Sequence, residues 1–418
     1  MKKILLILTL LLPIKLLSST LLIPMDDSQK EHLKAYGVCY WLLNKGVEAD
    51  WLLNYRGGSF AAENNNELEK ECILRGVSYE VLPSAQYQNI LRQIADPEVN
   101  MDLIKLQKPP KIAVYSPKNK LPWDDAVTMV LTYAEIPYDI IYDDEILDEL
   151  TLAKYDWLHI HHEDFTGQYG KFYGAYANAQ WYKDDQQLNE ECARRHGFSK
   201  VSQLKLAVAK RIKEFVAGGG FLFAMCSATD SYDIALAAEG KDICEAMFDG
   251  DGTTPGAAQK LNFDNGIAFE NYHLEMNPYV YEYSDIDATN TRQVPMDLDY
   301  FTLFDFSAKW DPVPTMLCQD HIRTIKGFMG QTTAFKSAFV KKNVLIMGEN
   351  KPAAEARYIH GELGKGTWTF YGGHDPEDYQ HLVGDPKTDL SLHPNSPGYR
   401  LILNNVLFPA AKKKKQKT

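Results

Sequence analysis

A cysteine directly follows one of the most apolar short runs in the sequence. Phe221–Met225 contains no polar residue and predicts a buried strand, and 232–238 predicts a helix after Cys226. A thiol at a strand-to-helix turn meets the helix N-terminus, whose N–H groups lower the thiol pKa and can hold an oxyanion. This position predicts that Cys226 is a nucleophile. The alternative is a small buried hydrophobic residue, because most free cysteines have that role.

A histidine follows the end of a second predicted strand. Thr367–Tyr371 predicts the strand, and two glycines separate it from His374. His374 could accept the proton of Cys226 while Glu377 or Asp375 orients its ring, which gives the arrangement of nucleophile, base and orienting acid. The alternative is a hydrogen-bonded histidine in a loop. We predict catalytic roles for Cys226, His374 and Glu377, and a substrate-binding role for Asp375.

Several histidines lie at the end of a third predicted strand, residues 155–160. His159 and His161 fall on one face because side chains alternate along a strand, so both could bind a divalent metal with Glu163 or His381. The alternative is a polar cluster in which the rings bond nearby carboxylates, since no zinc-binding spacing such as His-Glu-x-x-His occurs. No cofactor is expected, and the binding of a divalent metal is left as an open possibility. The substrate-binding residues predicted here are His161, His162 and Glu163.

The elements around these residues alternate in type. Predicted strands are separated by helical patterns of 10–15 residues, which is typical of βαβ units and a parallel sheet. Open parallel sheets bind ligands beyond the carboxyl ends of their strands, so the three stretches would meet at one edge. The predicted strands are 21–25, 47–55, 77–82, 111–115, 138–142, 155–160, 221–225, 344–348 and 367–371. The predicted helices are 28–43, 63–75, 85–95, 124–134, 201–216 and 399–407. The pattern predicts an α/β protein with a doubly wound, mostly parallel sheet.

Prolines and composition divide the chain. Pro109-Pro110 separates an N-terminal α/β unit (20–108) from a larger domain (109–408). From about 245 to 340, Asp, Asn, Pro and aromatic residues interrupt the alternation, which predicts a β-rich insertion with strands near 279–283 and 300–306. In residues 1–19 two lysines are followed by an apolar run, a pattern that predicts a signal peptide. Residues 409–418 predict a basic disordered tail.

Composition and charge exclude several function classes. The 418 residues are 45% hydrophobic and 24% charged, which is the composition of globular domains. The net charge of −12 would repel phosphate backbones, so nucleic-acid binding is not expected. No apolar run after the predicted signal peptide is long enough for an integral membrane segment. Six dispersed cysteines predict neither a zinc ribbon nor a disulfide scaffold. We expect a periplasmic or secreted protein with a small-molecule substrate, and the oligomeric state is left open.

The residues around Cys226 and His374 resemble the class I glutamine amidotransferase-like superfamily. That resemblance implies a flavodoxin-like sheet, with Cys226 as nucleophile and His374 as base. Amidotransferases of this class usually carry the acid two residues after the histidine, where this chain has Pro376. Across nearly the whole mature chain, the sequence also resembles exported bacterial proteins commonly labelled asparagine synthetase B. The matching stretches are WLLNYRGGSF at 51–60, HHEDFTGQYG at 161–170 and YGGHDPEDYQH at 371–381.

The label itself implies no synthetase activity, because the chain lacks the N-terminal cysteine nucleophile and the Ser-Gly-Gly-x-Asp-Ser loop of the enzyme whose name it borrows. The leading hypothesis is therefore an exported glutamine amidotransferase-like hydrolase that uses Cys226 and His374. One alternative is a metal-dependent hydrolase built on the His159 and His161 cluster with Glu163 and His374. A second alternative is a non-catalytic ligand-binding envelope protein that keeps the fold.

Overall fold

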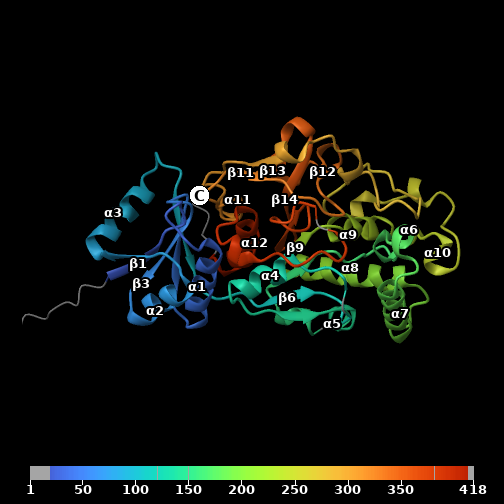
Figure 1. The fold of residues 1–418 in the computed structure, drawn as a ribbon, viewed down its shortest axis with the longest axis horizontal. Helices are drawn as coiled ribbons and strands as arrows, with labels where there is room; N and C mark the ends of the chain where they lie inside the picture. Colours follow the sequence, from blue (N-terminus) through green and yellow to red (C-terminus); the bar gives the residue numbers. More distant parts are fainter. Residues whose placement is uncertain (1–18, 120, 149, 381, 413–418) are drawn as a thin grey trace, which may run out of the picture.

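The protein has two β-sheets with helices packed around them, and it is a mixed α/β structure (Figure 1). The computed structural model describes residues 19–119, 121–148, 150–380 and 382–412. The predicted signal peptide lies outside the described residues except for Ser19, which begins the first strand. His381 also lies outside them. No helix in these described ranges is long and apolar enough to cross a membrane.

The N-terminal unit contains a five-stranded sheet in the order β4-β1-β3-β2-β5. Every neighbouring pair in it is antiparallel, so the prediction of parallel βα units for this part is wrong. The reason is a tight reversal at residues 54–58, where Asn54, Arg56, Gly57 and Gly58 have positive φ and turn β2 directly into β3. The strands are β1 Ser19–Ile23, β2 Ala49–Leu53, β3 Ser59–Glu63, β4 Glu80–Pro83 and β5 Asp102–Leu106.

Three helices accompany this sheet, close to the predicted ranges. They are α1 His32–Asn44, α2 Asn66–Arg75 and α3 Ser84–Ala95. The Asn65 side chain accepts the Leu68 N–H at the start of α2, and Gly76 ends that helix at φ 73°. Helix α1 is buried along most of its length and contacts α4 and α12 of the larger domain. It therefore joins the cores of the two parts.

The larger sheet has the order β11-β10-β13-β14-β15-β9-β8-β6-β7, with β12 pairing β14. The pairs from β7 to β15 through β6, β8 and β9 are parallel, whereas the pairs from β15 to β11 are antiparallel. The sheet is therefore mixed, and the predicted mostly parallel arrangement holds for one half. The strands are β6 Ile112–Tyr115, β7 Asp139–Ile141, β8 Trp157–Ile160, β9 Phe221–Met225, β10 Tyr300–Leu303, β11 Thr324–Lys326, β12 Phe335–Lys336, β13 Leu345–Asn350, β14 Glu355–Leu363 and β15 Gly366–Tyr371.

Helices cover both faces of the parallel half. Phe223 and Met225 of β9 belong to a core shared with α1, α4 and α12. Leu222 and Ala224 point to the other face and belong to a core shared with α8 and α9. Strand β9 is thus buried on both sides, which explains its uninterrupted apolar sequence. The helices of this domain are α4 Ala126–Tyr133, α5 Asp143–Leu147, α6 Tyr173–Tyr176, α7 Gln180–Arg195, α8 Val201–Gly218, α9 Ala228–Ala237, α10 Ala246–Asp249, α11 Pro312–Leu317 and α12 Pro397–Leu407.

The segment from about 245 to 340 consists mainly of turns, short helices and short strands. The predicted strand near 279–283 is wrong, because those residues form turns beside a single bridge between Leu274 and Ser284. The prediction near 300–306 is confirmed as β10, which extends the main sheet together with β11. The 3₁₀ helices of the chain are 152–154, 169–171, 257–259, 263–265, 289–291, 296–298, 337–339, 351–353, 390–392 and 408–410.

The start of the predicted tail is ordered against the N-terminal unit. Ala411 bridges Leu106 of β5, and the Lys412 N–H donates to the Lys105 carbonyl oxygen at 2.8 Å. Residues 413–418 lie outside the described part of the chain. Ala411 and Lys412 accordingly lie beside β5 of the N-terminal sheet.

Candidate active site at the carboxyl ends of the parallel strands

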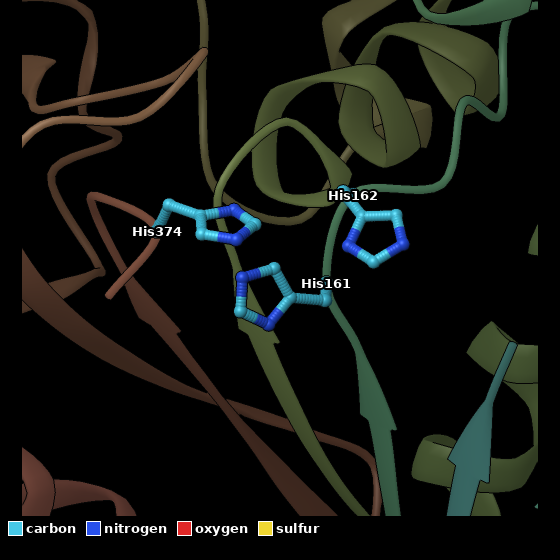
Figure 2. A group of neighbouring side chains, drawn as sticks. All are labelled: His161, His162 and His374. Atoms are coloured by element: carbon cyan, nitrogen blue, oxygen red, sulfur yellow. The ribbon is translucent and has the colours of Figure 1, made fainter. Parts of the chain in front are cut away.

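The three chemically interesting stretches meet at one edge of the larger sheet. Strands β8 and β9 pair in parallel, and so do β9 and β15, so their carboxyl ends lie side by side. His161 follows β8, Cys226 follows β9 and His374 follows β15 after two glycines. Figure 2 shows His161 and His162 at the end of one strand, with the ring of His374 facing that of His161. The expected juxtaposition of these residues is confirmed.

Cys226 adopts a backbone conformation that non-glycine residues seldom take. Its φ is +49°, in the left-handed region, and such a residue costs about 1–3 kcal/mol, so the surrounding structure must enforce it. The Cys226 N–H donates to the Gly373 carbonyl oxygen at 3.1 Å, and the Ala228 N–H donates to the His161 carbonyl oxygen at 3.0 Å. These bonds hold the turn from both neighbouring strand ends. The same sharp strand-to-helix turn presents the nucleophile in α/β-hydrolases.

The thiol of Cys226 is hydrogen-bonded to His374. Burial alone would raise the pKa of Cys226, but the hydrogen bond and charge of His374 bring it below the ordinary value. Burial alone would lower the pKa of His374, but hydrogen bonds with Asp124 and Cys226 raise it to about 10. Both shifts favour the thiolate–imidazolium form of this pair over the neutral thiol and imidazole.

The other five cysteines have a different environment. All are buried and free of disulfide bonds. Burial raises the pKa of each of these thiols, to about 12 for Cys72 and Cys192. Their surroundings match the inert hydrophobic role that most free cysteines have. Among the six cysteines, only Cys226 has a lowered thiol pKa.

Asp124 supplies the acidic group beside the His374 ring. The Nε2–H of His374 donates to the Asp124 carbonyl oxygen at 3.1 Å, and the Asp124 Oδ1 lies 3.9 Å from the same nitrogen. Asp124 lies between β6 and α4, at the same sheet edge, and its side chain is buried. The sequence places this residue at the start of a predicted helix, and only the strand-end rule applied to β6 could have selected it.

The acids predicted to orient His374 bind elsewhere. The Glu377 Oε2 lies 3.0 Å from His393 Nδ1, so this carboxylate pairs with a different imidazole. The Asp375 carboxylate accepts the Tyr399 hydroxyl at 2.8 Å and the Thr388 hydroxyl at 2.6 Å. Both acids thus fasten the chain after β15. In this geometry Asp124 replaces Glu377 as the acid next to the ring, because the turn at Asp375 directs the following residues away.

Backbone N–H groups surround the sulfur of Cys226. The Gln331 and Thr332 N–H groups hydrogen-bond it and contribute to its lowered pKa. Both belong to the inserted segment, where the sequence offers no periodic pattern that would reveal them. The N–H of Ser227 has no acceptor in the described ranges, whereas that of Ala228 is committed to His161. The Gln331 and Thr332 N–H groups stabilise the negative charge of the thiolate before attack, and the Ser227 N–H is the donor left for an oxyanion.

A second polar group lies behind the first. His159 Nε2 is 3.2 Å from His161 Nδ1, and the Asp125 Oδ2 lies 3.4 and 3.6 Å from these two nitrogens. The prediction that His159 and His161 share a face is confirmed. Burial lowers the pKa of His161 well below its ordinary value, and burial lowers the pKa of His162 to about 3. Both rings are therefore neutral near pH 7.

The Glu163 side chain bonds the backbone at the end of β8 and does not contribute to the group formed by His159, His161 and Asp125. Its Oε2 accepts the His161 backbone N–H at 3.0 Å, while its Oε1 makes no hydrogen bond and lies 3.6 Å from His162 Nε2. Burial raises the pKa of Glu163 to about 8. A cavity of about 40 Å³ lies against His162 and Glu163, enough for a few water molecules. Its other walls include Trp123, Phe172, Trp181, Asp185 and Lys205.

Two groups of side chains at this edge have the composition of a metal site. Ligand atoms of His161, His162 and His374 all lie within 4.8 Å of one another, and those of Asp125, His159 and His161 do so too. The structure thus divides the predicted candidates: His161 belongs to both groups, His159 to the one with Asp125, His374 to the one with His162, and Glu163 to neither. Imidazole nitrogens are ordinary ligands of zinc and of other divalent transition metals.

Comparisons with known proteins do not assign the chain to a family. No family model and no curated protein matches it. Among 14 matching chains of solved structures are two cytoplasmic proteins from Salmonella typhimurium, STM3548 (11% identity, TM-score 0.35) and STM1381 (14%, 0.36), each aligned over 72% of this chain and 100% of its own. A mutant of the GH42 β-galactosidase Gan42B from G. stearothermophilus shares 12% identity over 64% of this chain and 28% of its own, at a TM-score of 0.24. No argument about function is drawn from similarities this low.

Proposed function

We propose that this protein is an exported hydrolase of the glutamine amidotransferase-like kind, which cleaves an amide, ester or related bond of a small molecule. The observation that carries the proposal is the geometry of Cys226, a thiol in a left-handed turn that is hydrogen-bonded to His374. Asp124 holds the other side of the ring. Nucleophile, base and positioning acid therefore stand in the order that acyl transfer requires.

The order of the parallel strands supports the fold that this proposal implies. Taken in chain order, β6, β7, β8, β9 and β15 are the first to fifth parallel strands, and their spatial order is 2-1-3-4-5. That is the flavodoxin-like order, in which ligands bind beyond the carboxyl ends near the switch between the first and third strands. Asp124 and His161 follow those two strands, and Cys226 follows the next one.

The first half of the reaction would acylate the enzyme. The Cys226 thiolate attacks the carbonyl carbon, a carbon–sulfur bond forms, and the carbonyl oxygen takes the negative charge. The backbone N–H of Ser227 is the available donor for that oxygen, and the Gln331 and Thr332 N–H groups, which hydrogen-bond the sulfur, become available as its negative charge is lost. When the tetrahedral intermediate collapses, the bond to the leaving amine or alkoxide breaks and the His374 imidazolium donates its proton to that group.

The second half would release the acid. A water molecule attacks the thioester while neutral His374 accepts its proton, and the carbon–sulfur bond then breaks. The products are a carboxylic acid and a restored thiolate–imidazolium pair, so one water is consumed for each bond cleaved. The burial of Cys226, which is 3% exposed, favours a small substrate over a polymer.

Hydrolysis of a panel of chromogenic esters, thioesters and aryl amides by the secreted chain tests this proposal. Cys226→Ala should abolish any turnover found, and an acyl adduct on Cys226 should accumulate with slowly hydrolysed esters. Cys192→Ala is the matched control, since this thiol is also buried but lies on α7 beside Asp144. Undiminished turnover by Cys226→Ala would overturn the mechanism.

A further inference from the structure

Three imidazoles converge at the edge of the sheet, and the proposed thiol chemistry uses only one of them. His161 and His162 follow β8 and His374 follows β15 (Figure 2). The ring centroids of His161 and His374 are 4.5 Å apart, those of His161 and His162 are 5.3 Å apart, and those of His162 and His374 are 6.0 Å apart. One nitrogen from each ring lies within 4.8 Å of the other two.

The rings of His161 and His374 are hydrogen-bonded through their other nitrogen, and that of His162 has a carboxylate beside it. The Nδ1 of His161 lies 3.6 Å from the Asp125 carboxylate and 3.2 Å from His159. The Nε2 of His162 lies 3.6 Å from Glu163, and the Nε2 of His374 is bonded to Asp124. Histidines that bind metals are almost always held in this way by a carboxylate or carbonyl oxygen on the second nitrogen.

Two ring nitrogens of this group, one from His161 and one from His162, lack partners among the described residues. His161 Nε2 and His162 Nδ1 are buried and have no hydrogen bond within the described ranges. A buried polar atom without a partner costs about 1–3 kcal/mol, so an occupant that satisfies two such atoms would be stabilised. A neutral imidazole nitrogen with a free lone pair is the form that binds a metal ion.

We propose that His161, His162 and His374 form a binding site for a divalent transition metal, with Zn²⁺ as the ion that suits it best. Zinc binds imidazole nitrogens at about 2.0–2.1 Å in tetrahedral geometry, which requires ligand atoms about 3.4 Å apart. Small rotations of the three rings bring them to that spacing from within 4.8 Å. Three histidines leave the fourth position of a tetrahedral ion to water.

Metal binding at this site opposes the thiol chemistry. His374 is hydrogen-bonded to two groups in this structure: its Nε2 bonds Asp124, and its ring also bonds Cys226. A bound metal takes one of these nitrogens, so His374 can no longer both position itself on Asp124 and exchange a proton with the thiol. Zinc therefore inhibits hydrolysis. The proposal of zinc binding depends only on the geometry of the three histidine rings. The proposal of inhibition also depends on the proposed function.

Titration of the metal-free full chain with Zn²⁺, followed by calorimetry and by the melting temperature, tests the binding. We expect one ion per chain and a higher melting temperature. His161→Ala and His162→Gln should each weaken binding by at least the roughly 100-fold that loss of an outer partner can cost. His162 is partly exposed, so its variant should fold even if that of His161 does not.

Two control variants separate this site from other zinc-binding groups. Cys226→Ser should bind zinc as the native chain does, which excludes the thiol as an essential ligand. His196→Ala removes a ligand from the Asp144, Cys192 and His196 cluster and should also leave binding unchanged. Zinc binding that survives His161→Ala and His162→Gln but disappears in His196→Ala would overturn the proposal.

A third arm tests the inhibition once a substrate is in hand. Zn²⁺ at saturation should slow hydrolysis by the native chain at least 10-fold, and a chelator should restore the rate. Acceleration by zinc would overturn the inhibitory role. The two proposals can fail separately, because zinc binding is measured without any substrate and in the inactive Cys226→Ser variant.

Discussion

The N-terminal sheet and the edge of the larger sheet both bury polar side chains, but they treat them differently. In the N-terminal unit, His32 uses both ring nitrogens, which lie 2.9 Å from Asn395 Oδ1 and 3.1 Å from the Met25 carbonyl oxygen. The Asp50 carboxylate accepts the Tyr87 hydroxyl at 2.6 Å and pairs with Lys105 at 2.5 Å. Both nitrogens of His32 thus have partners, and the Asp50 Oδ1, which makes no hydrogen bond, is balanced by the charge of Lys105.

At the edge of the larger sheet, comparable groups remain incomplete. His161 Nε2, His162 Nδ1 and Glu163 Oε1 are buried without hydrogen-bond partners, and Cys226 is held in a left-handed conformation. Topology explains the contrast. Antiparallel strands send their ends to alternate edges, whereas parallel strands bring them to one edge. At this edge the left-handed Cys226 and the unpaired atoms of His161, His162 and Glu163 lie together at the ends of parallel strands, and this combination indicates a site for a ligand or reaction.

Replacing His374 gives the largest expected effect and tests the contrast between the two buried histidines. His374→Ala removes the hydrogen bond and charge that favour the Cys226 thiolate, so iodoacetamide should modify Cys226 about 100-fold more slowly at pH 7 in the presence of a chelator. His32→Ala should leave that rate unchanged, because His32 serves packing and hydrogen bonding near Asn395. Equal rates in the His374→Ala and native chains would contradict the pairing of thiol and imidazole.

Replacing Asp124 should have a smaller effect. The closest bond to His374 comes from the Asp124 backbone carbonyl, while its carboxylate lies 3.9 Å away. Asp124→Ala keeps the backbone bond and should slow modification of Cys226 by about 10-fold. The matched change Asp50→Ala removes a buried acid from the N-terminal sheet and should lower stability without changing the rate. A rate unaffected by Asp124→Ala would assign the positioning of the ring to the backbone alone.

The last expected effect is a pH-dependent difference in stability, with no change in the reactivity of Cys226. Burial raises the pKa of Asp230 to about 7, and its Oδ2 has no hydrogen-bond partner. A carboxyl whose pKa is raised by folding stabilises the protein when protonated, so this contribution falls as the pH rises from about 4 to about 7, by up to about 1.4 kcal/mol per unit of pH. Asp230→Asn keeps a neutral side chain, so its free energy of unfolding should exceed the native value at pH 8 and approach it at pH 4.5. Equal urea midpoints at pH 8 would contradict this assignment.

The sequence predicts where the site lies better than it predicts which residues form it. Strand-end positions sufficed to bring together Cys226, His374 and His161, because a buried apolar strand is visible from its residues alone. The role of Asp124 was not predicted, because its contact with His374 joins residues 250 positions apart and leaves no local sequence pattern. The Gln331 and Thr332 donors were not predicted either. Every residue except proline has a backbone N–H, so the residue type does not reveal which of them bonds the sulfur.

The fold was predicted least well where strands reverse sharply. The turn at 54–58 makes β2 and β3 antiparallel, and its Gly57-Gly58 pair is a turn signal that the prediction of alternating strands and helices did not use. Strand β14 has the sequence EARYIHGEL, in which charged residues break the apolar alternation although most of the strand is buried. Its partners β13 and β15 satisfy the backbone on both sides, which is a tertiary effect.

The most direct test is peptide-resolved alkylation of all six cysteines in the native chain. With a small alkylating agent at pH 7 and a chelator present, we expect Cys226 to be modified first and the other five only on unfolding, because Cys226 alone is paired with an imidazole and the rest have raised thiol pKa values. If Cys226 stays unmodified until the chain unfolds, together with Cys39 and Cys318, the thiol is an inert core residue and the account is contradicted.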